Sequence, residues 1–468
     1  MPDSLPLVPP RCSPALDPGF RPAALVHRAF RRQAEAAGPV PLVFGLERPD
    51  GSLSRYQTLI LPENHPESAT NTAIAERLLK FLLWQHGANK IYVGGPTSVG
   101  AHLAATYAPG AARAFDQQFM GDDVYARPFS VLPCRADEVP PPREITRALG
   151  RHLDGCRIGF DLGASDRKVA AVVDGVPVFS QETVWSPRTQ SDPTYHYGEI
   201  LAGLRAASAH LPRVDAIGGS AAGVYVDNQP RVASLFRGVP RDRFDEVRRL
   251  FLRIRSEMGV PLEVINDGEV TALAGSMSLE ANAILGIALG SSEAAGYVTR
   301  SGHLTSWLNE LAFAPIDYAP DAPRDEWSGD QGVGALYLSQ QCVFRLAPRA
   351  GLELPPTAEP AERLRHAQDR LAAGDAGAAA IWQTMGTYLG YGLAHYADFY
   401  DLDHVLVLGR CTSGHGGTIL IGNARTVLLT EFPELASRLR LHLPDETSRR
   451  VGQSIAAASL PALPEKVA

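Results

Sequence analysis

The sequence predicts an α/β fold in which apolar strands end in small or acidic residues. Strand-like and helical patterns alternate along most of the 468 residues, the order expected of α/β architectures. Strand-like stretches run directly into glycine, serine or aspartate in four segments: residues 158–175, 264–274, 287–298 and 405–417. Small residues let backbone N–H groups approach an anionic group closely. The pattern therefore indicates phosphate-binding turns at strand ends.

Residues 158–175 contain an apolar strand, a turn of small residues and a second apolar strand. Asp161 ends the first strand, and Gly163 and Ser165 lie in the turn. A carboxylate at this place can hold a hydrated divalent cation or orient a water, while the turn offers its amides to a phosphate. The alternative is a β-hairpin whose turn needs small residues only for its backbone geometry.

The order and spacing of the four segments resemble those of the sugar kinases of the ROK family (repressor, open reading frame, kinase). The resemblance covers residues 155–462. It implies two actin-like (ribonuclease H-like) lobes with a cleft between them, in which the sugar lies. It also implies phosphoryl transfer from ATP with Mg²⁺, and a homodimer.

The predicted domains follow changes in composition along the chain. Residues 1–24 are rich in proline and predict an irregular N-terminal arm. Residues 25–135 predict an accessory α/β domain, whose order of hairpin, helix, strand, glycine turn and helix imitates the start of an actin-like lobe. Residues 136–154 contain a run of prolines and predict a linker. The two lobes then occupy residues 155–280 and 281–468.

Asn266 and Asp267 follow a strand predicted at residues 261–265 and precede an alanine-rich helix. Phosphoryl transfer to a sugar hydroxyl needs a carboxylate that fixes the hydroxyl and accepts its proton. The resemblance assigns this role of catalytic base to Asp267, and a hydrogen bond to the sugar to Asn266. The alternative is that Asp267 only caps the following helix.

Two further segments are predicted to hold the sugar. The small-residue loop 218–223 contains Gly219 and Ser220 and forms a wall of the cleft in the resembled family; the alternative is a flexible strand-to-helix turn. Glu310 stands where the family has a glutamate that holds sugar hydroxyls, although Phe313 replaces the histidine that ties the family's segment to zinc. The alternative for Glu310 is an exposed acid beside a core aromatic.

The second phosphate loop differs from the family pattern. Gly290, Ser291 and Ser292 replace a loop rich in glycine and threonine, yet their hydroxyl and amide groups can still donate hydrogen bonds to phosphate oxygens. The next residue, Glu293, adds a negative charge that we expect to repel a polyphosphate unless Mg²⁺ or an arginine intervenes. Arg410, in a later turn, is a candidate partner for phosphate or for Glu293.

The last glycine-rich turn follows a strand at residues 404–408. Gly409 ends that strand, and Gly414 lies where the next helix begins. Glycines at a helix N-terminus suit a contact with adenosine or a ribose phosphate. The predicted cofactors are therefore ATP and Mg²⁺, with Asp161 as the residue that organises the metal.

The charge and hydropathy of the sequence argue against nucleic acid and membrane partners. Lys and Arg total 44 against 51 for Asp and Glu, a formal charge of −7, which argues against a nucleic acid partner. Many repressors of the resembled family begin with a winged-helix DNA-binding domain, but here the hairpin precedes the helix and basic residues are not clustered. No apolar run is long enough to span a bilayer, and the N-terminus lacks a signal pattern. The sequence predicts a cytoplasmic protein with no membrane partner.

The sequence also predicts free thiols and no structural zinc. Its five cysteines lie far apart: Cys12, Cys134, Cys156, Cys342 and Cys411. No two have the spacing of zinc ligands or of a disulfide framework. The zinc-binding cysteine cluster of many proteins in the resembled family is therefore missing.

The leading functional prediction is an ATP-dependent kinase that acts on a hexose-like sugar or related polyol. The competing prediction is a non-enzymatic regulatory protein that senses a sugar or a nucleotide. The altered loop at Gly290, the missing zinc motif and the additional N-terminal domain support this second class.

Overall fold

The computed structural model describes residues 5–147, 149–444 and 446–463, and these form two compact units. Unit 1 combines the described residues within 1–145 with residues 287–295 and 306–443. Unit 2 combines residues 146–286, 296–305 and the described residues from 444 onward. This grouping differs from the predicted domains, since residues 25–135 share a unit with most of the predicted second lobe.

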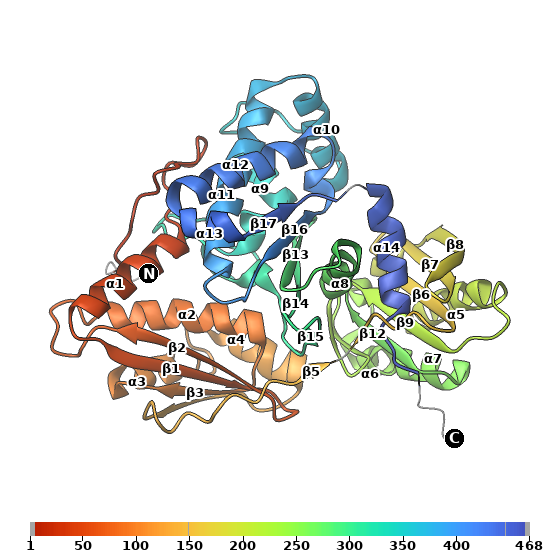
Figure 1. Ribbon diagram of the computed structural model, residues 1–468, viewed down its shortest axis with the longest axis horizontal. Coiled ribbons are helices and arrows are strands. Elements are labelled where there is room, and N and C mark those ends of the chain that lie inside the picture. The colour runs from red at the N-terminus through yellow and green to blue at the C-terminus, as the bar shows by residue number, and fades with distance from the viewer. Residues whose placement is uncertain (1–4, 148, 445, 464–468) are drawn as a thin grey trace. The chain divides into compact units, whose positions relative to one another are not determined.

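Unit 2 is built on a mixed sheet with the order β12-β9-β6-β7-β8 (Figure 1). Its strands are β6 (Cys156–Leu162), β7 (Asp166–Val173), β8 (Val176–Val184), β9 (Ala216–Ala221) and β12 (Leu262–Asn266). The first three form an antiparallel meander, and β9 and β12 extend it in parallel to β6. A meander followed by parallel strands is the sheet order of an actin-like lobe, as the resemblance implied.

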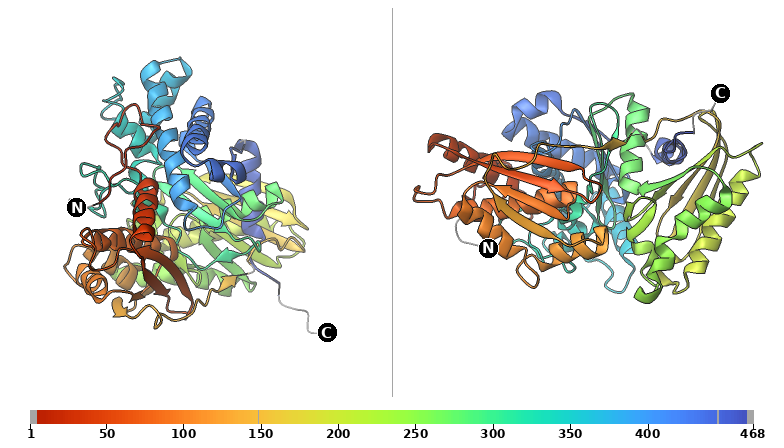
Figure 2. Two further views of the ribbon diagram at one scale, coloured as in Figure 1. Left: turned by 60° about the vertical axis from the view of Figure 1, so that its left-hand side comes forward. Right: turned by 90° about the horizontal axis from the view of Figure 1, so that it is seen from below.

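Helices cover both faces of this sheet (Figure 2). One face packs against α5 (Pro193–Ser208) and α7 (Leu250–Met258), with α6 (Phe244–Arg248) beside α7, and the other carries α8 (Asp267–Leu279) and α14 (Glu446–Ala458). Close approach of α14 requires glycine in the sheet, because a Cβ on Gly159 or Gly218 would overlap its backbone. A small hairpin of β10 (Val224–Val226) and β11 (Gln229–Val232) precedes α6. Because β6, β9 and β12 run parallel, their carboxyl ends lie on one edge of the sheet.

The N-terminal part of unit 1 holds a second sheet, ordered β2-β1-β3-β4. It contains β1 (Val40–Glu47), β2 (Leu53–Ile60), β3 (Lys90–Gly94) and β4 (Ser130–Cys134), with the helices α1 (Ala23–Ala36), α2 (Thr70–His86), α3 (Thr97–Thr106) and α4 (Ala114–Gln118). Strand β3 runs antiparallel to β1, whereas β9, the corresponding strand of unit 2, runs parallel to β6. The predicted likeness of this region to an actin-like lobe was therefore wrong in strand direction.

A further sheet has the order β17-β16-β13-β14-β15-β5. Its strands are β5 (Thr146–Arg147), β13 (Ile284–Leu289), β14 (Glu293–Val298), β15 (Leu304–Thr305), β16 (His404–Leu408) and β17 (Arg440–His442). The helices in residues 306–443 of unit 1 are α9 (Gln340–Leu346), α10 (Pro360–Ala372), α11 (Ala376–Tyr396), α12 (His415–Glu431) and α13 (Pro433–Arg438). None of the described helices combines the length and apolarity that crossing a bilayer requires.

The N-terminal arm is anchored within unit 1 before α1 begins. Asp17 accepts a hydrogen bond from the Tyr388 hydroxyl at 2.5 Å and pairs with Arg345 at 3.3 Å. Phe20 is buried, with its ring centroid 4.8 Å from that of Tyr388. Tyr388 of α11 therefore holds the arm both by ring packing and by a hydrogen bond.

Candidate functional site

In unit 2, four side chains meet near the ends of the central strands. Asp161 lies at the end of β6, where the Ser220 hydroxyl donates a hydrogen bond to its Oδ1 at 2.7 Å. The Lys168 ammonium lies 3.7 Å from Asp161 Oδ2 and 3.1 Å from Asp166 Oδ1. Asp161 and Lys168 face each other in the β6–β7 register, so counting back from the turn would have identified Lys168 from sequence.

The carboxylates of this cluster influence one another. Burial, reinforced by the negative charge of Asp161, raises the pKa of Asp267 to about 6. Burial also raises the pKa of Asp161, an effect that Ser220 and Lys168 oppose and Asp166 increases. Asp161 and Asp267 therefore belong to one electrostatic group, although they lie far apart in the sequence.

Asn266, rather than Asp267, is the N-cap of α8. Its Oδ1 accepts the Gly268 N–H at 2.7 Å, and its Nδ2 donates to the Gly223 carbonyl at 2.8 Å. Asp267 is the first residue of the helix, and its Oδ1 lies 3.1 Å from the Gly268 nitrogen. Asn266 is therefore the N-cap residue, and the Asp267 carboxylate shares the same Gly268 N–H over a longer distance.

The turn after β6 closes a tight hairpin. The Gly163 N–H donates to the Asp166 carbonyl at 2.9 Å, and the Gly163 carbonyl accepts the Trp185 indole N–H at 2.8 Å. Ser165 is exposed, and its hydroxyl donates to Asp166 Oδ2 at 3.0 Å. The Gly163 amide is therefore engaged within the protein, while Ser165 lies at the surface where a ligand can reach it.

Gly219 and Ser220 lie in strand β9 and not in a loop. Gly219 is buried, and a Cβ at this position would overlap the Phe160 ring. Close packing thus explains the glycine, while Ser220 points to Asp161 from the buried strand. The loop itself begins beyond Ala221, where Gly223 has a φ of 121°.

In unit 1, two of the predicted nucleotide turns are neighbours. The Gly290 N–H donates to the Ser292 carbonyl at 3.0 Å, and the Gly290 carbonyl accepts the N–H of Gln340 at the start of α9 at 2.9 Å. Gly409 has a φ of 102°, and a Cβ there would lie 2.5 Å from the Leu289 carbonyl oxygen. The loop after β13 and the turn after β16 therefore touch through backbone, which only glycine permits.

The hydroxyl groups and the helix start of this region are accessible. Ser291 and Ser292 are exposed, as are Arg410 and Gly414. Gly414 has a φ of 62° and directly precedes α12, so the amides of the first helical turn are available to an anion.

Glu293 does not lie where its charge would meet a polyphosphate, which corrects the expected repulsion. It is 2% exposed, and the Tyr396 hydroxyl donates to its Oε1 at 2.9 Å. Burial, opposed by this hydrogen bond and reinforced by Glu310, raises the pKa of Glu293 to about 8. The Glu293 carboxyl is therefore neutral at pH 7. Among the described residues it accepts its hydrogen bond from Tyr396, and not from Arg410 as was considered from the sequence.

Glu310 is half-buried and begins a short 3₁₀ turn, residues Leu311–Phe313. Its backbone N–H donates to the Trp84 carbonyl of α2 at 3.0 Å. Phe313, at the position of the family's histidine, is buried with its ring centroid 4.4 Å from that of Trp84. This contribution of the N-terminal region to the Glu310 segment could not be read from sequence, because α2 is far away in the chain.

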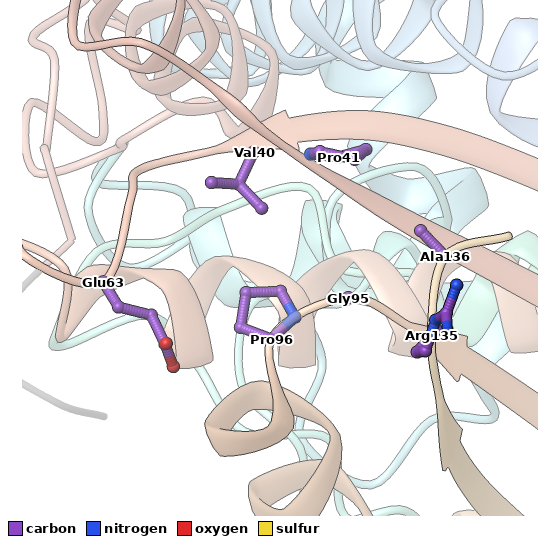
Figure 3. Close-up of a pocket in the computed structure, with 7 residues that line it drawn as sticks. All are labelled: Val40, Pro41, Glu63, Gly95, Pro96, Arg135 and Ala136. Carbon is purple, nitrogen blue, oxygen red and sulfur yellow. The ribbon is translucent and has the colours of Figure 1, made fainter.

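A separate pocket opens in the N-terminal part of unit 1 (Figure 3). Its volume is about 370 Å³, and it is lined by Val40, Pro41, Glu63, Gly95, Pro96, Arg135 and Ala136. It lies where β3 turns into α3 and contains none of the predicted site residues. We therefore assign it no part in the candidate site.

We expect no stoichiometric zinc in the purified protein. Among the described residues, no group of three or more His, Cys, Asp or Glu side chains is arranged to hold a metal ion, and all five cysteines are free thiols. Dialysis against a strong chelator should leave the melting temperature unchanged, and elemental analysis should find well under one zinc per chain. One tightly held equivalent of zinc would contradict this expectation.

Comparison with known proteins shows similarity in structure alone. Neither a protein-family model nor a curated protein matches this sequence. A ROK family glucokinase from Streptomyces griseus, solved with glucose and AMPPNP, is 20% identical with a TM-score of 0.50, covering 65% of this chain and 99% of its own. A ROK family transcriptional regulator, a homologue of the E. coli MLC protein, is 19% identical with a TM-score of 0.51, covering 66% of this chain and 79% of its own. The chain therefore has the two-lobed, actin-like fold of ROK-family sugar kinases and regulators.

Proposed function

We propose that this protein is an ATP-dependent kinase that phosphorylates a hexose-like sugar or related polyol. The observation that carries the proposal is the setting of Asp267, a half-buried carboxylate at the start of α8. Its pKa of about 6 leaves it ionised at pH 7 yet more basic than an ordinary aspartate, which suits a general base. The fold it shares with a glucokinase that binds glucose and AMPPNP supports the same reaction.

In this proposal the residues of unit 2 prepare the hydroxyl for transfer. Asp267 accepts a hydrogen bond from the sugar hydroxyl, orients it toward the γ-phosphate and takes its proton as the phosphoryl group moves. Asn266 holds α8 through Gly268 and holds the loop through Gly223. It thereby fixes the position of Asp267 and presents its amide beside the sugar.

Residues of unit 1 bind the rest of the sugar and the nucleotide in this proposal. Glu310 accepts hydrogen bonds from other sugar hydroxyls. The exposed hydroxyls of Ser291 and Ser292, with the turn at Gly409, donate to the nucleotide phosphates, while Gly290 lets the backbone of its loop approach them closely. Gly414 leaves room at the start of α12 for the nucleoside or its phosphate.

The acidic cluster of unit 2 suits Mg²⁺. Asp161 and its neighbour Asp166 would supply oxygen ligands of the kind that this ion prefers, usually one or two carboxylates together with water and phosphate oxygens. Burial raises the pKa values of Asp161 and Asp267, and the charge of Asp166 adds to the first shift as that of Asp161 adds to the second; a divalent cation would relieve this repulsion. Lys168 is the competing cation, since it already pairs with two of these acids. When bound, Mg²⁺ would neutralise charge on the phosphates.

We expect the rate of transfer to depend on the ionisation of Asp267. Because a base must be deprotonated, kcat/KM should fall about tenfold for each pH unit below the Asp267 pKa of about 6, and should level off above it. Initial rates between pH 4.5 and 8.5, at fixed free Mg²⁺, would measure this. A flat profile across that range would remove Asp267 as the base.

The proposal is tested by a thermal-shift screen of hexoses and polyols with and without Mg·ATP, followed by direct detection of the sugar phosphate. A ligand that binds the native state raises the melting temperature. Shifts with both sugar and Mg·ATP, together with sugar-dependent ADP release, support the kinase. A shift with nucleotide alone and no transfer to any sugar would contradict it.

A sensor without catalysis is the second candidate. The Gly163 amide, expected to bind phosphate, donates instead to the Asp166 carbonyl, and the fold is shared with a transcriptional regulator. In the same screen, a sensor responds to sugar in the absence of nucleotide and releases no ADP.

A further inference from the structure

Helix α2 of the N-terminal region ends in a fully paired last turn. The final carbonyls of a helix have no partner within it. Here the Leu83 carbonyl accepts the Gly87 N–H, and the His86 carbonyl accepts Arg48 Nη1. The two carbonyls between them, of Trp84 and Gln85, accept N–H groups from residues 310 and 309, at 3.0 and 2.9 Å. The backbone of the Glu310 segment therefore completes the helix.

Side chains fix the same segment. Asn309 is 2% exposed and has a φ of 52°, a left-handed conformation that asparagine tolerates better than most other residues with a side chain. The Tyr400 hydroxyl donates to Asn309 Oδ1 at 2.9 Å. On the other side of Glu310, the Phe313 ring lies against Trp84 at 4.4 Å. Glu310 thus lies between two anchored neighbours.

An ionic cluster ties α2 to the next loop of unit 1. Arg77 Nη2 lies 3.1 Å from Asp330 Oδ1, and Arg113 Nη1 lies 2.8 Å from Asp330 Oδ2. Lys80 is 3.6 Å from Asp330 Oδ2 and 2.5 Å from Asp116 Oδ1. Burial raises the pKa of Asp330, but Arg77 and Lys80 outweigh it and hold that pKa below its usual value. Asp330 is therefore ionised and paired at neutral pH, which holds its loop against α2.

We propose that helix α2 positions Glu310, so that the N-terminal region is a structural part of the sugar-binding half of unit 1. Trp84 is the central positioning residue, since its carbonyl holds the Glu310 amide, its ring packs on Phe313, and its indole N–H donates to Asp116 at 2.9 Å. The substrate role of Glu310 rests on the proposed function, whereas the anchoring by α2 does not.

The experiment compares Trp84→Ala with Trp84→Phe in the full chain. The alanine variant loses the ring contact with Phe313, so the amides of residues 309 and 310 should exchange with deuterium about tenfold faster or more. Displacement of Glu310 should raise the KM for sugar about 10- to 100-fold while the KM for ATP stays near that of the parent. Trp84→Phe keeps an aromatic ring beside Phe313 and should restore both values to within about threefold of the parent.

Leu103→Ala is the matched control for lost stability. Leu103 is fully buried in α3 of the same region, so this variant should lower the melting temperature without changing exchange at residues 309 and 310 or the KM for sugar. Parent-like exchange in Trp84→Ala, or the same effect in Leu103→Ala, would overturn the anchoring by α2. Faster exchange with an unchanged KM would overturn its role in substrate binding. A parent that neither binds nor phosphorylates sugars would refute the proposed function. The hydrogen-exchange measurement would still decide whether α2 anchors the Glu310 segment.

Discussion

Asp267→Asn should slow phosphoryl transfer by about 10²- to 10⁴-fold, because an amide cannot accept the proton of the sugar hydroxyl. The fold should survive this change, since Asn266, and not Asp267, caps α8. Asparagine has the size of aspartate and carries no charge, so it also avoids the burial of a charge and the repulsion by Asp161 that together raise the pKa of Asp267 to about 6. That pKa lies about two units above the ordinary value, so the variant should be as stable as the parent at pH 7, or up to about 3 kcal/mol more stable.

Single-turnover rates and chemical denaturation of the same preparations would separate chemistry from stability. Asp245→Asn is the matched control, because Asp245 lies in unit 2 with its side chain 75% exposed and should tolerate the change with no loss of rate. Transfer at the parent rate in Asp267→Asn would exclude Asp267 as the base. A large loss of stability would show that the carboxylate serves the fold instead.

Glu293→Gln should make the protein more stable at alkaline pH. Glutamine imitates the neutral carboxyl that burial enforces, and its carbonyl can still accept the Tyr396 hydroxyl. In the parent, the folded state keeps the Glu293 proton up to a pKa of about 8, while the unfolded chain releases it near 4.5. The parent therefore loses stability as the pH rises from about 4.5 to about 8, by an amount on the order of 3–5 kcal/mol.

Urea denaturation at pH 5, 7 and 9 would test this. The difference between Glu293→Gln and the parent should be small at pH 5 and largest at pH 9. Glu362→Gln, on the exposed side of α10, provides the control and should follow the parent at every pH. An equal pH dependence in parent and Glu293→Gln would show that Glu293 is ionised in the folded protein.

Local sequence patterns predicted most elements of the fold. The hairpin of β1 and β2, helix α2 and the strand leading to Asn266 follow from alternation, helical spacing and turn residues, which act between near neighbours. Strand direction is different, because the packing of whole elements decides it. The sequence of the N-terminal region therefore imitated an actin-like lobe, although β3 pairs antiparallel to β1.

The candidate site could be predicted where a short sequence motif determines the local backbone geometry. The positions of Asn266 and Asp267 could be predicted because a strand end is followed directly by a helix start. The direction in which a side chain points was harder to predict. Glu293 follows an exposed turn yet faces the interior toward Tyr396, and Gly219 lies in a strand packed on Phe160. Both outcomes depend on contacts with residues that are distant in the chain. A single sequence does not show which distant residues are in contact.

The closure of α2 by residues 309 and 310 has a consequence for the order of folding. During synthesis the N-terminal sheet emerges well before its partner segment, so the last turn of α2 must wait without the N–H partners of two carbonyls and without the contact of the Trp84 ring with Phe313. Contacts between such distant positions are slow to form because a long loop must close first. We therefore expect an early intermediate with a formed N-terminal sheet, an exposed apolar face on α2 and a tendency to associate until residue 310 has been translated and docked.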